Sequence, residues 1–170
     1  YIGVSNYTKE LLLEMKEYAE IMPAVNQLEY HPRYASKDLV ETAKSLGVLL
    51  IGYGMGTSIQ IGMSSSDNVA SNATKKIDAV LEEISKRMNK SKHQIIARWM
   101  KQQNIIPLPR SSNPEHIKEN INIYDFELSD DDTPELFNSD TKEELLNNSE
   151  DSNSEEEDLE IPAFLRRQKN

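Results

Sequence analysis

Two hydrophobic patterns alternate along the chain as far as Ser129. Short apolar runs are followed by segments in which apolar residues recur every three or four positions between Lys and Glu residues. The first pattern predicts strands and the second predicts amphipathic helices. The expected strands cover residues 1–6, 23–30, 48–53 and 105–108. The expected helices cover residues 8–20, 36–47, 73–89 and 91–100, with a last one that starts at Asn113.

This order repeats a strand–helix unit four times, which favours right-handed βαβ connections and a parallel sheet. Signals for helix starts support the assignment. Ser91 and Gln94 have the spacing of a capping box, and Asn113 and Pro114 suit the cap and the first position of a helix. Backbone N–H groups at such a helix start attract anions, so the turn before Pro114 is a candidate ligand-binding element.

Composition narrows the class of protein. The 170 residues include no cysteine, which excludes a disulfide framework and thiolate metal sites. No apolar run is long enough to span a membrane and no signal peptide is visible, so we expect a cytoplasmic protein without a membrane span. The chain starts within a strand-like run at Tyr1, and we therefore expect further sequence upstream.

Charge separates the body of the chain from its tail. Of the 29 acidic and 19 basic residues, 14 and 4 lie in residues 129–170, which leaves 15 of each before them. The whole formal net charge of −10 therefore lies in the tail, which is a physically separate segment. No nucleic-acid partner is expected.

Polar side chains collect just after each predicted strand. In parallel α/β folds the carboxyl ends of the strands carry the ligand site, so this placement indicates a site at one edge of the sheet. The alternative is that small polar residues there only cap the helices that follow, and the pattern alone favours neither interpretation. The residues concerned are Ser5, Asn6, Gln27, Glu29, Tyr53, Arg110 and Ser111.

Four segments resemble a known family. The segments "IGVSNY", "PAVNQLEYHP", "IGYG" and "IPLPRSSNPEHIKENINIYDFELS" follow one another in the family's order. Together, residues 1–131 resemble the second half of an aldo-keto reductase. The resemblance implies an α/β fold, the C-terminal half of a (β/α)8 TIM barrel with four βα units. It also implies reduction of carbonyl groups with a nicotinamide cofactor, NADPH or NADH.

The same resemblance implies cofactor contacts at the strand ends. Ser5, Asn6 and Gln27 would hold the nicotinamide carboxamide, and an amide side chain can both donate to and accept from such a group. Tyr53 would stack on the nicotinamide ring and fix the face that is presented for hydride transfer.

At the other end of the cofactor, the resemblance places Arg110 and Ser111 near the adenosine 2′-phosphate. A guanidinium can bind a phosphate in a bidentate manner. Glu119 and Asn120 would meet the adenine. His116 stands where the family often has arginine, and an imidazole is charged only near or below pH ~6.5. The choice between NADPH and NADH therefore stays open.

The family's catalytic Asp, Tyr, Lys and His lie in the first half of the barrel, which this sequence does not contain. The chain alone is expected to be inactive, because general acid catalysis contributes about 10²–10⁴-fold. His31 is expected to be a structural residue under a loop, and His93 is expected to lie at the surface. A half-barrel leaves open sheet edges, so we expect it to pair with an N-terminal half or with a second copy.

The family pattern stops near residue 132. Residues 132–158 are rich in Ser, Asn, Asp and Glu and predict a disordered acidic linker. Residues 159–170 resemble the C-terminal peptide of the bacterial division GTPase FtsZ, which implies docking of Leu159–Gln168 on a division-protein adaptor. The alternative is a frayed terminus without a partner.

The chain as a whole thus resembles two partial proteins joined together. A gene fusion, a mis-assembled reading frame and a constructed sequence all fit this pattern. The alternatives to a reductase half are a non-catalytic interaction protein that acts through the C-terminal peptide, and a degraded product without function.

Overall fold

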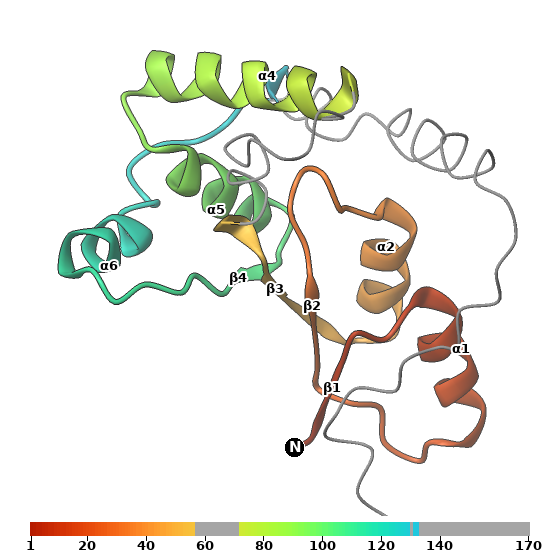
Figure 1. Cartoon of the computed structure of the whole chain (residues 1–170). Coiled ribbons are helices and arrows are strands. Elements are labelled where there is room, and N and C mark those ends of the chain that lie inside the picture. The colour runs from red at the N-terminus through yellow and green to blue at the C-terminus, as the bar shows by residue number, and fades with distance from the viewer. Residues whose placement is uncertain (57–71, 130, 133–170) are drawn as a thin grey trace, which may run out of the picture.

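The computed structural model of the chain describes residues 1–56, 72–129, 131 and 132 (Figure 1). The alternating order of strands and helices predicted from the hydrophobic pattern is confirmed. In chain order the elements are β1 (Gly3–Ser5), α1 (Lys9–Tyr18), β2 (Val25–Glu29), α2 (Lys37–Ser45), β3 (Leu49–Tyr53), α4 (Asn72–Met88), α5 (Lys92–Gln102), β4 (Ile106–Pro107) and α6 (Pro114–Ile121).

The four strands form one parallel sheet in the order β1-β2-β3-β4. Its register aligns Ser5 with Gln27, Gln27 with Ile51, and Ile51 with Ile106. The predicted parallel α/β sheet is therefore confirmed. The last strand is shorter than the predicted 105–108, because Pro107 within it and Pro109 soon after it lack the N–H groups that a longer ladder needs.

The two faces of this sheet differ in burial. Leu28 and Leu50 point to one face and are buried, with 6% and 3% of their surface exposed. Leu49 and Ile106 point to the opposite face and keep 41% and 43% of their surface exposed. Successive residues of a strand alternate between faces, so this contrast applies to whole faces of the sheet. Helices cover one face, and the other face is open as far as the described residues extend.

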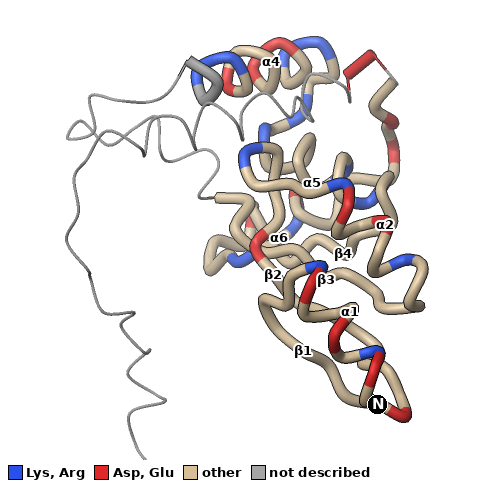
Figure 2. The backbone as a smooth tube through the Cα atoms, turned by 90° about the vertical axis from the view of Figure 1, so that its right-hand side faces the viewer, with Lys and Arg blue, Asp and Glu red and all other residues tan. Residues whose placement is uncertain are grey.

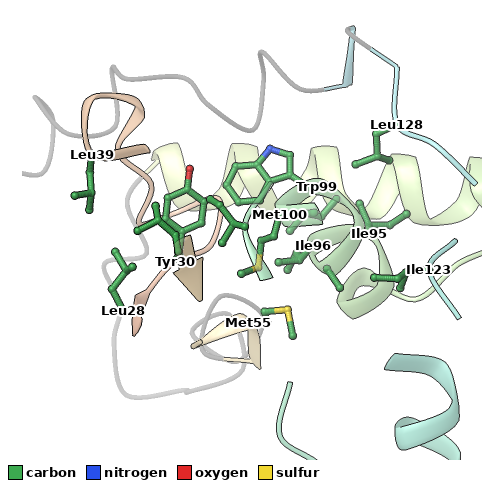
Figure 3. Close-up of a cluster of buried hydrophobic side chains, with 14 of the residues drawn as sticks. Leu28, Tyr30, Leu39, Met55, Ile95, Ile96, Trp99, Met100, Ile123 and Leu128 are labelled. Carbon is green, nitrogen blue, oxygen red and sulfur yellow. The ribbon is translucent and has the colours of Figure 1, made fainter. Parts of the chain in front are cut away.

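The hydrophobic core lies on the covered face, between the sheet and α5 (Figure 3). Helix α5 is buried continuously from Gln94 to Met100. The rings of Tyr30 and Trp99 stack with centroids 5.4 Å apart and an interplanar angle of 23°. Gly52 allows α5 to approach β3, because a Cβ at this position would collide with the Cε of Met100. The strands and α5 therefore form one packed unit.

Three polar residues spaced four apart on α5 bind the chain that follows in sequence. We call Gln94, Arg98 and Gln102 the polar stripe. The Nε2 of Gln94 donates to the carbonyls of Glu119 and Asn122 at 3.2 and 2.9 Å, and Arg98 donates to the carbonyl of Ile123 at 3.2 Å. Helix α6 itself has no buried residue. Its position is therefore set by these polar contacts more than by apolar burial.

Charged residues lie mainly on the helices, and the strands are almost free of them (Figure 2). Near the end of the described chain, the carboxylate of Asp132 is buried and accepts bonds from the N–H and Oγ of Ser129 at 2.9 and 2.8 Å. It also pairs with Arg87 on α4. The first residue of the predicted linker is therefore packed on the body, because its charge is bound there.

The rest of the predicted acidic linker, 133–158, and the predicted docking peptide, 159–170, lie outside the described residues. They stay predictions from sequence. In the part of the chain that the structure describes, no helix is both long and apolar enough to cross a membrane.

Candidate cofactor-binding site

The carboxyl ends of β1, β2 and β3 bring four predicted site residues together. The Oγ of Ser5 donates to the carbonyl of Gln27 at 3.0 Å, and the N–H of Asn6 donates to the same oxygen at 2.8 Å. The Oη of Tyr53 donates to the Oδ1 of Asn6 at 3.1 Å. We call these four residues the strand-end cluster. They form one hydrogen-bonded patch across three adjacent strands.

A residue that the sequence analysis missed holds the turn after β1. Asn26 is fully buried on β2, and its Oδ1 accepts from the N–H of Tyr7 at 3.2 Å. Its Nδ2 donates to the carbonyl of Tyr7 at 2.9 Å. The turn also requires a φ of 59° at Asn6, a left-handed conformation that asparagine adopts more readily than most residues. The available signal was its place two residues before Leu28, which puts both side chains on the same face of the strand.

Glu29, the last residue of β2, forms a pair with His31 just beyond the strand. The Nε2 of His31 lies 3.0 Å from the Oε1 of Glu29, and His31 is 4% exposed. Burial lowers the pKa of His31, and the hydrogen bond and charge of Glu29 oppose this shift only in part. A buried imidazole that stays neutral fits the structural role predicted for His31. Gly54, with φ of 86°, leaves room for Glu29, because a Cβ there would lie 3.0 Å from its Cγ.

The second set of predicted residues lies on the loop after β4 and on α6. The N–H of Asn113 donates to the Oγ of Ser111 at 3.1 Å, and the N–H of Glu115 donates to the Oδ1 of Asn113 at 2.9 Å. The predicted helix cap is therefore confirmed. Except for the partly buried Ser111 and Asn120, the predicted site residues here are exposed. We call this set the helix-end group: Arg110, Ser111, His116, Glu119 and Asn120.

The structure separates the two interpretations of the polar residues after the strands. The N-cap residues are Thr8, Ser36, Ser91 and Asn113, for the helices whose caps the structure describes. None of the seven polar residues predicted at the strand ends is one of these caps. Helix capping therefore does not explain them, and their role in binding a ligand stays a prediction from sequence.

The chemistry of these groups is that of binding and orientation. Amide, hydroxyl and phenol groups can both donate and accept hydrogen bonds, and a guanidinium can donate them. Over residues 1–56, 72–129, 131 and 132, no group of three His, Asp or Glu side chains has the geometry of a metal site. The described residues thus define a parallel α/β protein with a patch of hydrogen-bonded polar residues at the carboxyl ends of its strands.

Comparison with known proteins specifies the class further. The chain belongs to the aldo/keto reductase family, whose pattern matches residues 1–139. It is 35% identical over 141 residues to morphine 6-dehydrogenase of Pseudomonas putida, a match that covers 82% of this chain and 47% of that protein. The predicted resemblance to the family is therefore confirmed. The C-terminal peptide, 159–170, lies beyond the residues that the family pattern matches, and its resemblance to FtsZ stays a prediction.

Solved structures give the same result. An aldo-keto reductase enzyme from a Medee basin deep-sea metagenome library has a TM-score of 0.66 at 30% identity and is matched over 80% of this chain and 46% of its own. A Bombyx mori aldo-keto reductase in complex with NADP has a TM-score of 0.68 at 27% identity, over 80% of this chain and 43% of its own. The chain spans about half the length of the relatives it matches.

Proposed function

We propose that this chain is the cofactor-binding half of an NAD(P)H-dependent aldo-keto reductase that reduces a carbonyl to an alcohol. The observation that carries the proposal is the strand-end cluster. In it the hydroxyl of Ser5 donates to the backbone carbonyl of Gln27, and the phenol of Tyr53 donates to the side-chain amide of Asn6, in a chain that belongs to this family.

The strand-end cluster would bind the nicotinamide end of the cofactor. Asn6 and Gln27 offer amide groups that complement a carboxamide. The hydrogen bond from Tyr53 to Asn6 limits the movement of the phenol ring, which would keep an aromatic face available for stacking. When bound, the reduced nicotinamide supplies the hydride, and these residues only hold and orient it.

The helix-end group would bind the adenosine end. Arg110 and Ser111 lie directly before the capped start of α6, where backbone N–H groups and the helix dipole favour an anion. A guanidinium and a hydroxyl next to that start can donate to a phosphate. Glu119 and Asn120, two turns further along α6, would contact the adenine.

Catalysis requires groups from a second set of βα units. The open face of the sheet would be the inner wall of a barrel, and a further half would cover it and supply the proton donor. The isolated chain would then bind cofactor but turn over little, since general acid catalysis contributes about 10²–10⁴-fold.

Fluorescence titration of NADPH with the full 170-residue chain tests this proposal. We expect saturable binding and no oxidation of NADPH in the presence of aldehydes. Tyr53→Ala removes the stacking ring and should raise Kd about tenfold, whereas Tyr53→Phe keeps the ring and should raise it less than about threefold. Rapid turnover by the chain, or equal binding by both variants, would contradict the proposal.

A second candidate function follows from the sequence of the tail alone. Apolar residues followed by Arg166 and Arg167 at the end of an acidic stretch are typical of a docking peptide. A synthetic peptide of residues 157–170 should then bind a bacterial division-protein adaptor at micromolar Kd, and Phe164→Ala should abolish that binding. Equal binding by both peptides would contradict this function.

A further inference from the structure

The described part of the chain ends in a contact with α4. Asp132 keeps only 8% of its surface exposed, and its carboxylate pairs with Arg87 in the last turn of α4. The N–H and Oγ of Ser129 donate to the same carboxylate and hold it in this orientation. The segment that follows residue 132 in sequence is therefore tethered beside α4 by an ion pair.

Helix α4 and the turn after it form the positively charged region of the body. Residues 72–92 hold six Lys or Arg and three Asp or Glu, whereas the other residues up to 128 hold 9 basic and 12 acidic ones. Figure 2 shows basic residues near both ends of α4. An acidic segment is therefore attracted to this helix in preference to the rest of the body.

Four cations of α4 lie along one side of the helix. Lys75 and Lys86 are 11 residues apart, as are Lys76 and Arg87, and 11 residues are close to three whole turns. All four are exposed, and we call them the basic stripe. The only carboxylate between their two rows is that of Glu83.

The cations of the basic stripe differ in the charges that they meet. Arg87 pairs with Asp132, and Lys86 pairs with Glu82 at 3.2 Å. Neither Lys75 nor Lys76 forms an ion pair with any residue within the described ranges, and the first turn of α4 holds no acidic residue. The end of the stripe farther from Asp132 is therefore open to a carboxylate from elsewhere.

We propose that the basic stripe is the docking surface for an acidic run of this same chain, residues 150–160, which lies outside the described residues. This run holds seven Asp or Glu and no Lys or Arg. Its docking would extend along α4 the contact that Asp132 already makes with Arg87. The contact is independent of cofactor binding, because neither the strand-end cluster nor the helix-end group includes these residues.

The length of the connecting chain suits a contact within one molecule. The acidic run begins 18 residues after Asp132, and a flexible stretch of that length spans about 20–25 Å. The 12 residues from Arg87 back to Lys75 cover about 18 Å of helix. Effective concentration is greatest when the length of a linker matches the span between its sites, so several ion pairs that are weak singly are enough for docking.

Docking of the acidic run would change the surface that the molecule offers to partners. The cations of α4 would be shielded, so another polyanion would have to displace the run before it could bind there. The predicted docking peptide, 159–170, overlaps the end of the run and would be presented from α4.

Paramagnetic relaxation measured on the full chain tests the inference. The sequence has no cysteine, so Ser154→Cys gives a single attachment site for a nitroxide within the acidic run. At low salt we expect strong broadening of the amide signals of α4 and little broadening of those of α1 and α2. The broadening of α4 should be lost in about 1 M NaCl, where the Debye length falls to about 3 Å.

Two matched pairs of lysines separate docking on the basic stripe from a general attraction between charges. Lys75→Gln combined with Lys76→Gln should lower the ratio of docked to free acidic run at least about threefold. Lys16→Gln combined with Lys44→Gln removes two exposed cations from α1 and α2 and should change that ratio less than about 1.5-fold. All four side chains are exposed, so neither pair of changes should disturb the fold.

Three results would overturn the inference: equal broadening of α1, α2 and α4, broadening of α4 that persists at high salt, or equal effects of the two lysine pairs. A mixture of isotope-labelled chain without the nitroxide and unlabelled chain with it provides a further control. Broadening of α4 in this mixture would place the contact between copies and would also overturn docking within one chain.

Discussion

The two ends of the candidate cofactor site are built in different ways. At the strand end, the four residues of the strand-end cluster lie on or directly after adjacent strands. Two bonds to the carbonyl of Gln27 and one bond between the side chains of Tyr53 and Asn6 connect them. At the helix end, the site residues stand on a loop and on α6, a helix with no buried residue. The first end is part of the folded sheet. The second end is held against α5 by hydrogen bonds from the polar stripe to backbone carbonyls.

This difference means that stability and binding are coupled at one end and separable at the other. A change that disturbs the turn after β1 alters the hydrogen bonding of the sheet itself. A change to an exposed side chain on α6 would remove a proposed ligand contact and would leave the packed core intact. Variants at the two ends should therefore fall into distinct groups when folding and binding are both measured.

The largest effect is expected at the strand end, from Asn26→Ala. This substitution removes two buried hydrogen bonds to Tyr7 and leaves its backbone groups without those partners. We expect the free energy of unfolding to fall by about 2–3 kcal/mol, measured by urea denaturation. Ser5→Ala is the control, because its hydrogen bond is exposed and its loss should cost less than about 1 kcal/mol. Equal losses would show that Asn26 does not anchor the turn.

The support of the helix end is tested by Gln94→Glu. The Oε1 of Gln94 accepts from the N–H of Ser91 at 3.0 Å, and a carboxylate retains this half of the capping box. It cannot donate to the carbonyls of Glu119 and Asn122. We expect a loss of about 2 kcal/mol and faster hydrogen exchange of the α6 amides. If exchange in α6 is unchanged, the polar stripe does not hold this helix.

At the helix end, Arg110→Ala is expected to weaken cofactor binding without changing the stability of the fold. Loss of a charge-assisted bond to the 2′-phosphate should weaken NADPH by about 1–2 kcal/mol and leave NADH within about 0.5 kcal/mol. Because Arg110 is exposed, the free energy of unfolding should stay within about 0.5 kcal/mol of the wild-type value. Calorimetry with both cofactors measures the first effect, and a parallel loss for NADH would place Arg110 away from the phosphate.

The smallest effect is expected from the buried histidine near the strand end. Because burial lowers the pKa of His31, this side chain binds a proton more readily in the unfolded chain than in the folded chain. The contribution of His31 to stability is therefore fully present above the pKa of an unfolded histidine, ~6.5, and it falls as pH drops below that value. His31→Gln should reduce the slope of the free energy of unfolding against pH between about pH 7 and pH 5, by less than about 1.4 kcal/mol per pH unit. A slope that is unchanged in this variant would contradict the assignment.

Much of the fold could be predicted from the sequence because its signals are local. Apolar runs such as that at 48–53 and the cap at Asn113 depend on neighbouring residues, and both appear as predicted. The strand-end cluster followed from the rule that parallel strands end at one edge. The same rule carries no information about side chains that reach across elements.

The missed features all depend on contacts between distant parts of the chain. Asn26 binds a turn 19 residues earlier, and Arg98 is buried in α5 because its guanidinium meets the carbonyl of Ile123 and the carboxylate of Glu127. Asp132 belongs to the predicted linker by composition, but Arg87 and Ser129 bind it to the body. A polar residue in a buried position was the only sequence signal for these contacts, and it does not name the partner.

The most direct test of the account is whether both ends respond to one ligand. Amide NMR spectra of the full chain should be recorded as NADPH is added. We predict shifts in one saturable event at the strand ends, around Asn6, Gln27 and Tyr53, and at the helix end, around Arg110 and Glu119. Shifts at one end only, or at the two ends with different Kd values, would contradict the claim that they form a single cofactor site.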